Sequence, residues 1–197
     1  MSSVTAQNIK QNNNDPQYAV NPTRFVLWLL IVASIMLFAG FTSAYIVRRA
    51  EGNWMQFALP ASLWISTFTI LLSSVSMVWA YRAAKKDSIN QVKYGLITTL
   101  VLGFIFLYSQ YNAFFDLVEM GVYLSGSNVA GSFLIIIAGV HFAHILGGLL
   151  WLTIVLYQSF NFKVHKKNIL NISLCNTYWH FIGLLWVYLF VFFMLYR

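Results

Sequence analysis

The sequence predicts an all-α integral membrane protein with five transmembrane helices. Of its 197 residues, 59% are hydrophobic and only 9% are charged, whereas an average soluble domain has about 25% charged residues. Five apolar segments are each long enough for a membrane-spanning helix, which needs about 20 residues. Short polar loops with basic residues separate these segments. We therefore expect one membrane domain over residues 24–197, after a flexible, polar cytoplasmic tail over residues 1–23.

The first two spans are predicted at residues 25–47 and at about 59–81. The first is closed by Arg48 and Arg49, and the second begins beside Pro60, a residue that suits the first turn of a helix. The tail before them contains no apolar segment followed by a small-residue cleavage site. It therefore does not resemble a cleaved signal peptide.

The third and fifth spans are predicted at about 92–115 and 176–196. Gly95, Thr99 and Gly103 form a stripe of small residues on the third span, which allows another helix to approach closely. The fifth span is rich in aromatic residues, and we interpret it as a helix that faces lipid or a partner, with interfacial anchors. Its aromatic residues include Tyr178, Trp179, Trp186, Tyr188, Phe190, Phe192 and Phe193.

The fourth span, residues 131–160, contains no Lys, Arg, Asp or Glu. A helical period places His141, His144 and Gly148 on one face, and a stripe of small residues beside it (Gly139, Ala143 and Gly147). We therefore predict a buried central helix that other helices approach closely.

The histidines of the fourth and fifth spans suggest two interpretations. His141, His144 and His180 could together ligate a metal, because imidazole is a common ligand. However, no carboxylate stands nearby, Cys175 is the only cysteine and falls on a different face from His180, and two histidines on one helix face cannot ligate a haem from both sides. We favour the second interpretation, that they form hydrogen bonds between helices. No catalytic, cofactor or metal-binding residue is predicted.

The basic residues indicate the orientation. Nine Lys and Arg residues lie in the tail and the second and fourth loops, and three lie in the first and third loops and at the C-terminus. Because positive residues collect in the cytoplasm, we expect a cytoplasmic N-terminus and an outer C-terminus. The net charge of +7 is thus a topology signal and does not indicate nucleic-acid binding. One cluster could also bind anionic lipid head groups: Lys163, His165, Lys166 and Lys167.

No acidic or basic side chain lies in the middle of a span. Ion pumps and carriers normally place such a group on their path. The spans therefore argue against a small transporter or channel, and a membrane scaffold is a further alternative. Gly-x-Ser-x-Gly is also absent, so nothing indicates a serine nucleophile.

Two segments resemble subunit III of the haem–copper oxidases. These are Gly-Val-His-Phe-Ala-His-Ile-Leu-Gly-Gly at 139–148 and Tyr-Trp-His-Phe-Ile-Gly-Leu-Leu-Trp at 178–186. Leu-Phe-Ala-Gly-Phe-Thr-Ser-Ala-Tyr at 37–45 is similar to the first conserved helix of that family, and Gln110 matches a family glutamine. The resemblance covers nearly all of residues 24–197, and the chain is similar to the short, five-helix bacterial form. The signature residues carried over are His141, His144, Gly148, Tyr178, Trp179 and His180.

The resemblance implies an accessory subunit of a terminal oxidase that reduces dioxygen to water with electrons from cytochrome c. It implies that subunits I and II are the partners and hold the haems and copper. The helices would divide into a two-helix and a three-helix group around a phospholipid-filled cleft. The chain would do no chemistry itself and would support the stability, lipid shell and dioxygen or proton access of subunit I, in a bacterial plasma membrane. A supercomplex with a quinol-oxidising complex is a further possible partner.

The sequence departs from the family at three acidic positions. Ser34, Ala113 and Gly183 stand where many members carry Glu, Glu and Asp. A proton-buffering role of the first of these acids therefore does not transfer to this chain. The same subunit in a quinol oxidase, or the accessory protein of a nitric oxide reductase, stays open as an alternative.

Overall fold

The computed structural model describes residues 21–50, 61–119, 129–160 and 169–196. These residues form five α-helices, each long and apolar enough to cross a membrane. The predicted all-α, five-span membrane fold is thereby confirmed. The helices are α1 (Pro22–Ala50), α2 (Ser62–Lys85), α3 (Ile89–Glu119), α4 (Val129–Phe160) and α5 (Leu170–Tyr196).

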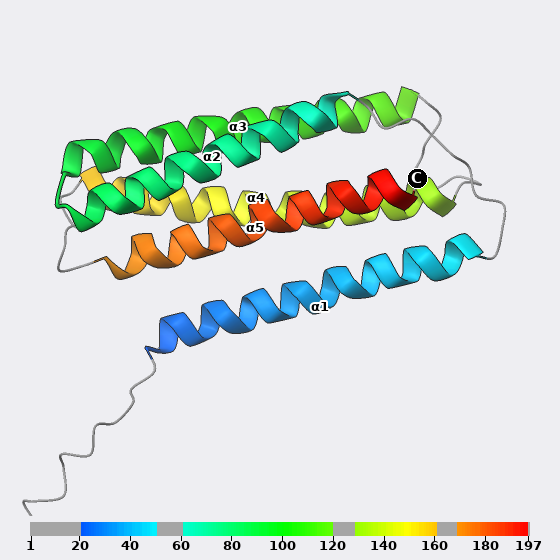
Figure 1. Cartoon of the computed structure of the whole chain (residues 1–197), viewed down its shortest axis with the longest axis horizontal. Coiled ribbons are helices and arrows are strands. Elements are labelled where there is room, and N and C mark those ends of the chain that lie inside the picture. Colours follow the sequence, from blue (N-terminus) through cyan, green and yellow to red (C-terminus); the bar gives the residue numbers. More distant parts are fainter. Residues whose placement is uncertain (1–20, 51–60, 120–128, 161–168, 197) are drawn as a thin grey trace, which may run out of the picture.

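The five helices lie side by side along one long axis (Figure 1). Helices α2 and α3 form a tight hairpin, α4 packs on α3 and α5, and α5 also packs on α2. Helix α1 contacts α4 and α5 and has no contact with α2 or α3. The described helices are therefore a four-helix bundle with α1 along one side, and they show no division into a two-helix and a three-helix group.

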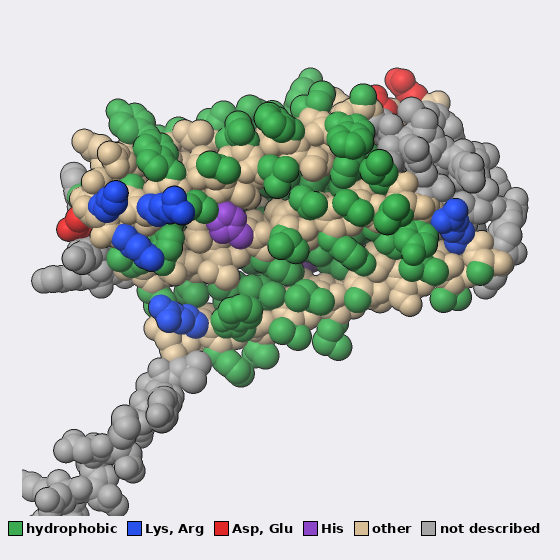
Figure 2. Space-filling view, viewed as in Figure 1, with side chains coloured by type: hydrophobic (Ala, Val, Ile, Leu, Met, Phe, Trp, Pro, Cys, Tyr) green, Lys and Arg blue, Asp and Glu red, His purple; other side chains and the backbone are tan. Residues whose placement is uncertain are grey.

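The surface of the bundle is that of a membrane protein. Apolar side chains cover its middle, and Lys and Arg side chains gather toward the two ends (Figure 2). Large apolar residues such as Trp28, Met36 and Leu150 are exposed along the outward faces. These faces meet lipid or partner helices in a bilayer.

The helices extend beyond the predicted spans at most of their ends. Helix α1 begins at Pro22, where the Asn21 side chain accepts a hydrogen bond from the Thr23 amide at 3.3 Å. Asn and Pro at these two positions are a usual helix start. Helix α5 begins at Leu170, where Asn171 donates to the Gln158 side chain of α4 at 3.1 Å. Because this polar residue has a partner, the helix starts before its apolar segment does.

The small residues of α3 are where other helices approach most closely, as predicted. A Cβ atom added at Gly95 would lie 2.7 Å from the Ala80 Cβ of α2. The Thr99 and Ser76 hydroxyls hydrogen-bond at 2.7 Å between the same two helices. At Gly103, an added Cβ would lie 2.6 Å from the Leu149 side chain of α4. Glycine at these positions lets α3 contact α2 on one side and α4 on another.

The most enclosed helix is α5, and the prediction that the fourth span occupies the centre is wrong. In the most apolar 18-residue window of each helix, 56% of residues are buried in α5 and 39% in α4. The prediction that the aromatic run of α5 faces lipid or a partner is also wrong. Every member except the exposed Tyr188 is buried. Since α5 contacts α1, α2 and α4, its aromatic rings fill the space between helices.

The small-residue stripe of α4 does not pack within the described bundle. Gly139, Ala143 and Gly147 are exposed, and no described atom would contact a Cβ added at Gly139. Gly148, one residue further, is the glycine that receives α5, since an added Cβ would lie 2.9 Å from the Ile182 side chain. The predicted close approach therefore occurs on the neighbouring face of the same helix.

Candidate helix interface and apolar pocket

His144 joins α4 to α1 through hydrogen bonds. Its Nδ1 lies 2.8 Å from the Val140 carbonyl oxygen, and its Nε2 lies 3.3 Å from the Ser34 hydroxyl. A carbonyl oxygen only accepts, so Nδ1 carries a proton, and Nε2 of a neutral imidazole then accepts from Ser34. The Ser34 hydroxyl also lies 2.8 Å from the Leu30 carbonyl oxygen, so its single proton has two possible acceptors.

His141 lies deeper and forms no hydrogen bond within the described residues. It is 1% exposed, and neither ring nitrogen has a partner among these residues. Its ring stacks on Trp186 of α5, with 5.3 Å between ring centroids, and meets the edges of Phe38 of α1 and Phe106 of α3. His141 is thus an aromatic contact between four helices, while His144 is the hydrogen-bonding histidine.

The signature histidines do not form a metal-ligand set. The described residues contain no cluster of three or more His, Cys, Asp or Glu side chains able to hold a metal ion. Three aromatic rings enclose His141, and the Nε2 of His144 faces the Ser34 hydroxyl. His180 lies half-buried on α5. The haem and copper that the resemblance assigns to partner subunits do not fit this group of residues.

Helix α2 supplies hydroxyl groups to polar N–H groups of α5 and α3. The Trp179 indole donates to Ser73 Oγ at 2.9 Å, and the Trp186 indole donates to Thr67 Oγ1 at 3.0 Å. The Gln110 amide donates to Ser66 Oγ at 2.9 Å. Each of these hydroxyls also donates to a carbonyl of its own helix. The sequence indicated only small-residue packing here. The two tryptophans are seven residues apart and the two hydroxyl residues are six apart. Both separations are close to two helical turns, and this is the signal that could have predicted these bonds.

Tyr178 and Gly148 fix the contact between α4 and α5. The Tyr178 hydroxyl donates to the His144 carbonyl oxygen at 3.2 Å, and its ring lies 5.8 Å from that of Trp151. At Gly148, the space for a Cβ is filled by Ile182, Tyr178 and Trp179. Five of the six family-signature residues, all but His180, therefore take part in described contacts between helices.

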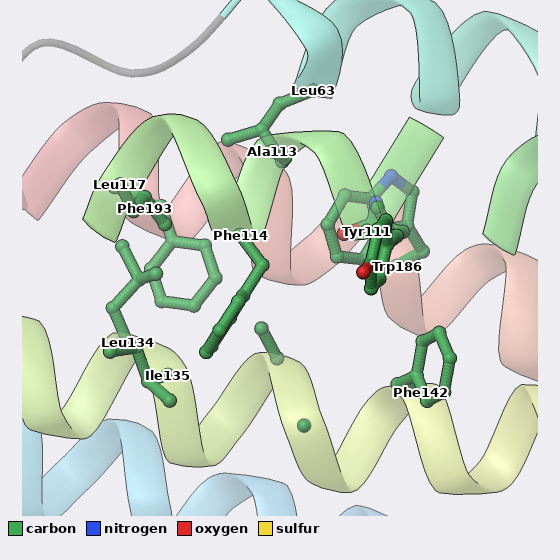
Figure 3. A pocket seen from close by; sticks show the side chains of 13 residues that line it. Leu63, Tyr111, Ala113, Phe114, Leu117, Leu134, Ile135, Phe142, Trp186 and Phe193 are labelled. Carbon is green, nitrogen blue, oxygen red and sulfur yellow. The ribbon is translucent and has the colours of Figure 1, made fainter. Parts of the chain in front are cut away.

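An apolar pocket of about 320 Å³ lies at the end of the bundle where α2 begins and α3 ends. Aromatic side chains of α3, α4 and α5 form its walls (Figure 3). Such a volume is within the range of small-molecule sites, about 300–1,000 Å³. Its lining is Leu63, Gln110, Tyr111, Ala113, Phe114, Leu117, Leu134, Ile135, Ala138, Gly139, Phe142, Trp186 and Phe193. A lining of this kind is complementary to apolar groups.

The predicted head-group residues lie outside the described residues. These are Lys163, His165, Lys166 and Lys167. Their contact with lipid stays a prediction.

Comparison with known proteins identifies the family. A family model described as cytochrome c oxidase subunit III matches residues 13–197. The chain belongs to the cytochrome c oxidase subunit III family. Relatives include the cytochrome c oxidase subunit 3 of Corynebacterium diphtheriae, which is 33% identical over 165 residues, 80% of each chain. The quinol oxidase subunit 3 of Bacillus subtilis is 29% identical over 171 residues, 83% of this chain and 81% of its own.

The match to the subunit III family extends to a human relative. The human cytochrome c oxidase subunit 3 is 25% identical over 199 residues, which cover 95% of this chain and 74% of the human one. The relatives of this subunit III chain thus include subunits of both cytochrome c oxidases and quinol oxidases.

All three positions where the resemblance led us to expect an acid are buried in the described structure. Ser34 faces His144 between α1 and α4, and Ala113 lines the apolar pocket. Gly183 lies against α2, where an added Cβ would be 3.3 Å from Ser74 Oγ. Among the described residues, the acidic side chains Asp87, Asp116 and Glu119 all lie at helix ends or turns. The described interior of this subunit III is therefore free of carboxylates.

Proposed function

We propose that this chain is the accessory subunit III of a respiratory terminal oxidase that reduces dioxygen to water. The match to the subunit III family across residues 13–197 carries the proposal. The chain performs no chemistry of its own and supports the catalytic subunit I, while subunits I and II hold the haems and copper. Its setting is a bacterial plasma membrane, with the N-terminus in the cytoplasm.

The described contacts suit a supporting role. The buried polar groups of α2, α3 and α5 mostly bond one another. They are hydroxyl, amide and indole groups, which suit helix packing better than proton transfer. The outward faces of α1 and α4 are apolar, and α4 also presents Gly139, Ala143 and Gly147. Exposed small residues of this kind favour close contact with a helix of another subunit.

We further propose that the chain binds phospholipid. The apolar pocket lined by Phe114, Phe142 and Phe193 suits an acyl chain, and the lysines at positions 163, 166 and 167 suit anionic head groups. Exchanging these three lysines for glutamine should reduce the anionic lipid that co-purifies with the complex. Unchanged lipid content would contradict this part of the proposal.

Cytochrome c is the electron donor that we propose, because a cytochrome c oxidase subunit 3 is among the most similar relatives. Quinol is the second candidate, because quinol oxidase subunits 3 match over a similar length. The donor binds elsewhere in such a complex, so a copper-binding subunit II in the purified assembly would favour cytochrome c.

The decisive experiment is purification of the tagged chain from gently solubilised membranes, with mass spectrometry and a haem spectrum. We expect haem-containing oxidase subunits to co-purify in equal amounts, and we expect the chain separated from them to carry no haem or copper. Stoichiometric metal on the separated chain, or the absence of an oxygen-reducing partner, would overturn the proposed function.

A further inference from the structure

Helix α5 has one side that no other described helix covers. Helices α1, α2 and α4 pack on α5, and α4 also contacts α1, whereas α1 and α2 do not contact each other. In Figure 1, α5 lies between α1 and α2. Leu184, Tyr188 and Val191 follow one another at helical spacing, and they are 71%, 44% and 46% exposed. The side of α5 that lies between α1 and α2 is therefore uncovered, and we call it the open face.

Contacts on either side mark the edges of the open face. Toward α1, the Tyr188 hydroxyl lies 3.0 Å from the Thr42 hydroxyl. Toward α2, a Cβ atom added at Gly183 would lie 3.3 Å from Ser74 Oγ. At 100° per residue, His180 falls between these two edges, on the same side of α5 as the exposed leucine one turn later. The open face thus contains one imidazole, and the structure shows it half-buried.

His180 lies close to the middle of the membrane. The residue before it, Trp179, donates its indole N–H to Ser73 Oγ at 2.9 Å. Ser73 lies midway along α2, which runs from Ser62 to Lys85. The middle of a hydrocarbon core about 30 Å thick is about 15 Å from either interface. An imidazole is too short to reach the interface from this depth, as a long Lys or Arg side chain can do nearer a helix end.

The imidazole of His180 has no partner within the described part of the chain. Neither this ring nor the half-buried Ser74 hydroxyl at the edge of the open face forms a hydrogen bond among the described residues. A histidine in a membrane span nearly always faces a protein interior or a water-filled cavity and pairs with another group. Lipid tails offer no hydrogen bond, and the hydrocarbon core contains no water. The missing partner of His180 is therefore expected from another protein chain.

We propose that the open face of α5 binds a transmembrane helix of another subunit, and that a hydroxyl or carboxamide side chain of that helix hydrogen-bonds His180. A neutral imidazole has one donor and one acceptor nitrogen. Ser, Thr, Asn or Gln can therefore satisfy it without bringing a charge into the membrane. The exposed Leu184 and Val191 would supply apolar contacts along the rest of the helix.

This interface rests on the proposed function, because the partner helix is assigned to another subunit of the oxidase complex. It is separate from the exposed small-residue stripe of α4 and from the apolar pocket.

The test uses the full chain in its complex, in native membranes. The photoreactive amino acid p-benzoylphenylalanine replaces Leu184, which lies one helical turn after His180 on the open face. After irradiation, mass spectrometry identifies the crosslinked peptide. We expect a peptide from a membrane-spanning segment of another oxidase subunit, with Ser, Thr, Asn or Gln within one helical turn of the crosslink.

Variants of His180 test the hydrogen bond itself. Loss of an interhelical hydrogen bond in a membrane weakens association by about threefold on average and by about 20-fold at most. His180→Phe keeps an aromatic ring and should raise the dissociation constant of the crosslinked subunit in detergent by about this factor. His180→Gln keeps a donor and an acceptor and should preserve the wild-type value. If His180→Phe does not assemble, the crosslink from position 184 in the otherwise unchanged chain decides the matter.

A second crosslinking position controls for assembly. Phe104 is 56% exposed on α3, a helix that does not contact α5. The same photoreactive residue at position 104 should give a crosslinking yield that His180→Phe does not change, whereas the yield from position 184 should fall.

Crosslinks from position 184 that reach only lipid, or only a second copy of this chain, would overturn the interface. Equal dissociation constants for the wild type and both His180 variants would do the same. Co-purification with haem-containing subunits would in either case still support the proposed function. A crosslink to a membrane helix in an assembly without haem-containing subunits would instead contradict the proposed function and leave the interface in place.

Discussion

At the scale of single residues, the two histidines of α4 have different environments although they are only three positions apart. His144 forms two hydrogen bonds, one of them to Ser34 of α1, whereas His141 has no partner among the described residues and stacks on Trp186. A buried polar group without a partner destabilises the folded state. The imidazole hydrogen bonds of His144 therefore stabilise the folded chain, whereas the unpartnered ring nitrogens of His141 destabilise it.

This difference predicts opposite effects of the same substitution. His144→Phe should lower the free energy of unfolding by about 0.6 kcal/mol, the average for an interhelical hydrogen bond in a membrane, because its bond to Ser34 of α1 is lost. His141→Phe removes two unpartnered nitrogens and should leave the free energy of unfolding unchanged or higher. Unfolding of the detergent-solubilised chain, followed by circular dichroism, measures both.

The His141 prediction has a clear contrary outcome. A loss of about 2 kcal/mol or more in the His141→Phe variant, the cost of a broken buried hydrogen bond, would show that a bound water or another group satisfies the imidazole. Ser34→Ala is the companion variant, and it should reproduce part of the His144→Phe loss without altering any aromatic contact.

At the scale of the helices, the space around each glycine shows whether another helix of this chain packs there or the surface is uncovered. Gly95 lies against the backbone of Ala80, with 3.0 Å between an added Cβ and the Ala80 Cα. No described atom lies within 4 Å of a Cβ atom added at Gly139. Backbone atoms cannot move aside as a flexible side chain can, so α2 and α3 would have to separate if Gly95 gained a Cβ.

The substitution Gly95→Ala should therefore destabilise the chain by about 1–3 kcal/mol, the usual cost of overpacking. Gly139→Ala is the matched control, and it should stabilise α4 by up to about 1 kcal/mol through helix propensity. Thermal unfolding of the solubilised chain distinguishes the two. Equal effects of both variants would contradict the close contact between α2 and α3.

The indole–hydroxyl pairs provide a second test of how helices join. Trp179→Phe and Ser73→Ala each break the bond between α5 and α2, and the double variant should be more stable than the sum of the single losses predicts. We expect a coupling of about 0.6 kcal/mol, with an upper limit of about 1.7 kcal/mol, from double-mutant cycles in membrane proteins. Trp186→Phe with Ser73→Ala is the control pair, because Trp186 bonds Thr67. Additive losses for Trp179 and Ser73 would contradict the hydrogen bond.

At the scale of the whole molecule, orientation follows from the distribution of charge. Nine of the basic residues belong to the side of the N-terminus and three to the other side. The only cysteine, Cys175, is buried, so an introduced cysteine can be labelled without background. A membrane-impermeant maleimide should label Arg197→Cys in intact spheroplasts and Ser2→Cys only after permeabilisation. The reverse pattern would contradict the proposed orientation.

The sequence by itself determined the five spans and the family. Uninterrupted apolar segments define membrane helices without any knowledge of packing, and the motifs at 139–148 and 178–186 carried the family resemblance. The close-packing stripe at Gly95, Thr99 and Gly103 was also predictable, because small residues at helical spacing are typical of helix contacts in membranes. The starts of α1 and α5 were less exact, because polar residues such as Asn171 continue a helix when they find partners.

Only the tertiary structure decided which face of each apolar helix is buried. The sequence predicted a central fourth span and an outward aromatic face on the fifth, and the structure encloses α5 and leaves Gly139, Ala143 and Gly147 of α4 exposed. The reason is that lipid tails are as apolar as leucine, so hydrophobicity does not separate lipid-facing from protein-facing positions. Which positions face protein is decided by contacts between helices, such as the hydrogen bonds of His144, Trp179 and Trp186. These contacts exist only once the helices have come together.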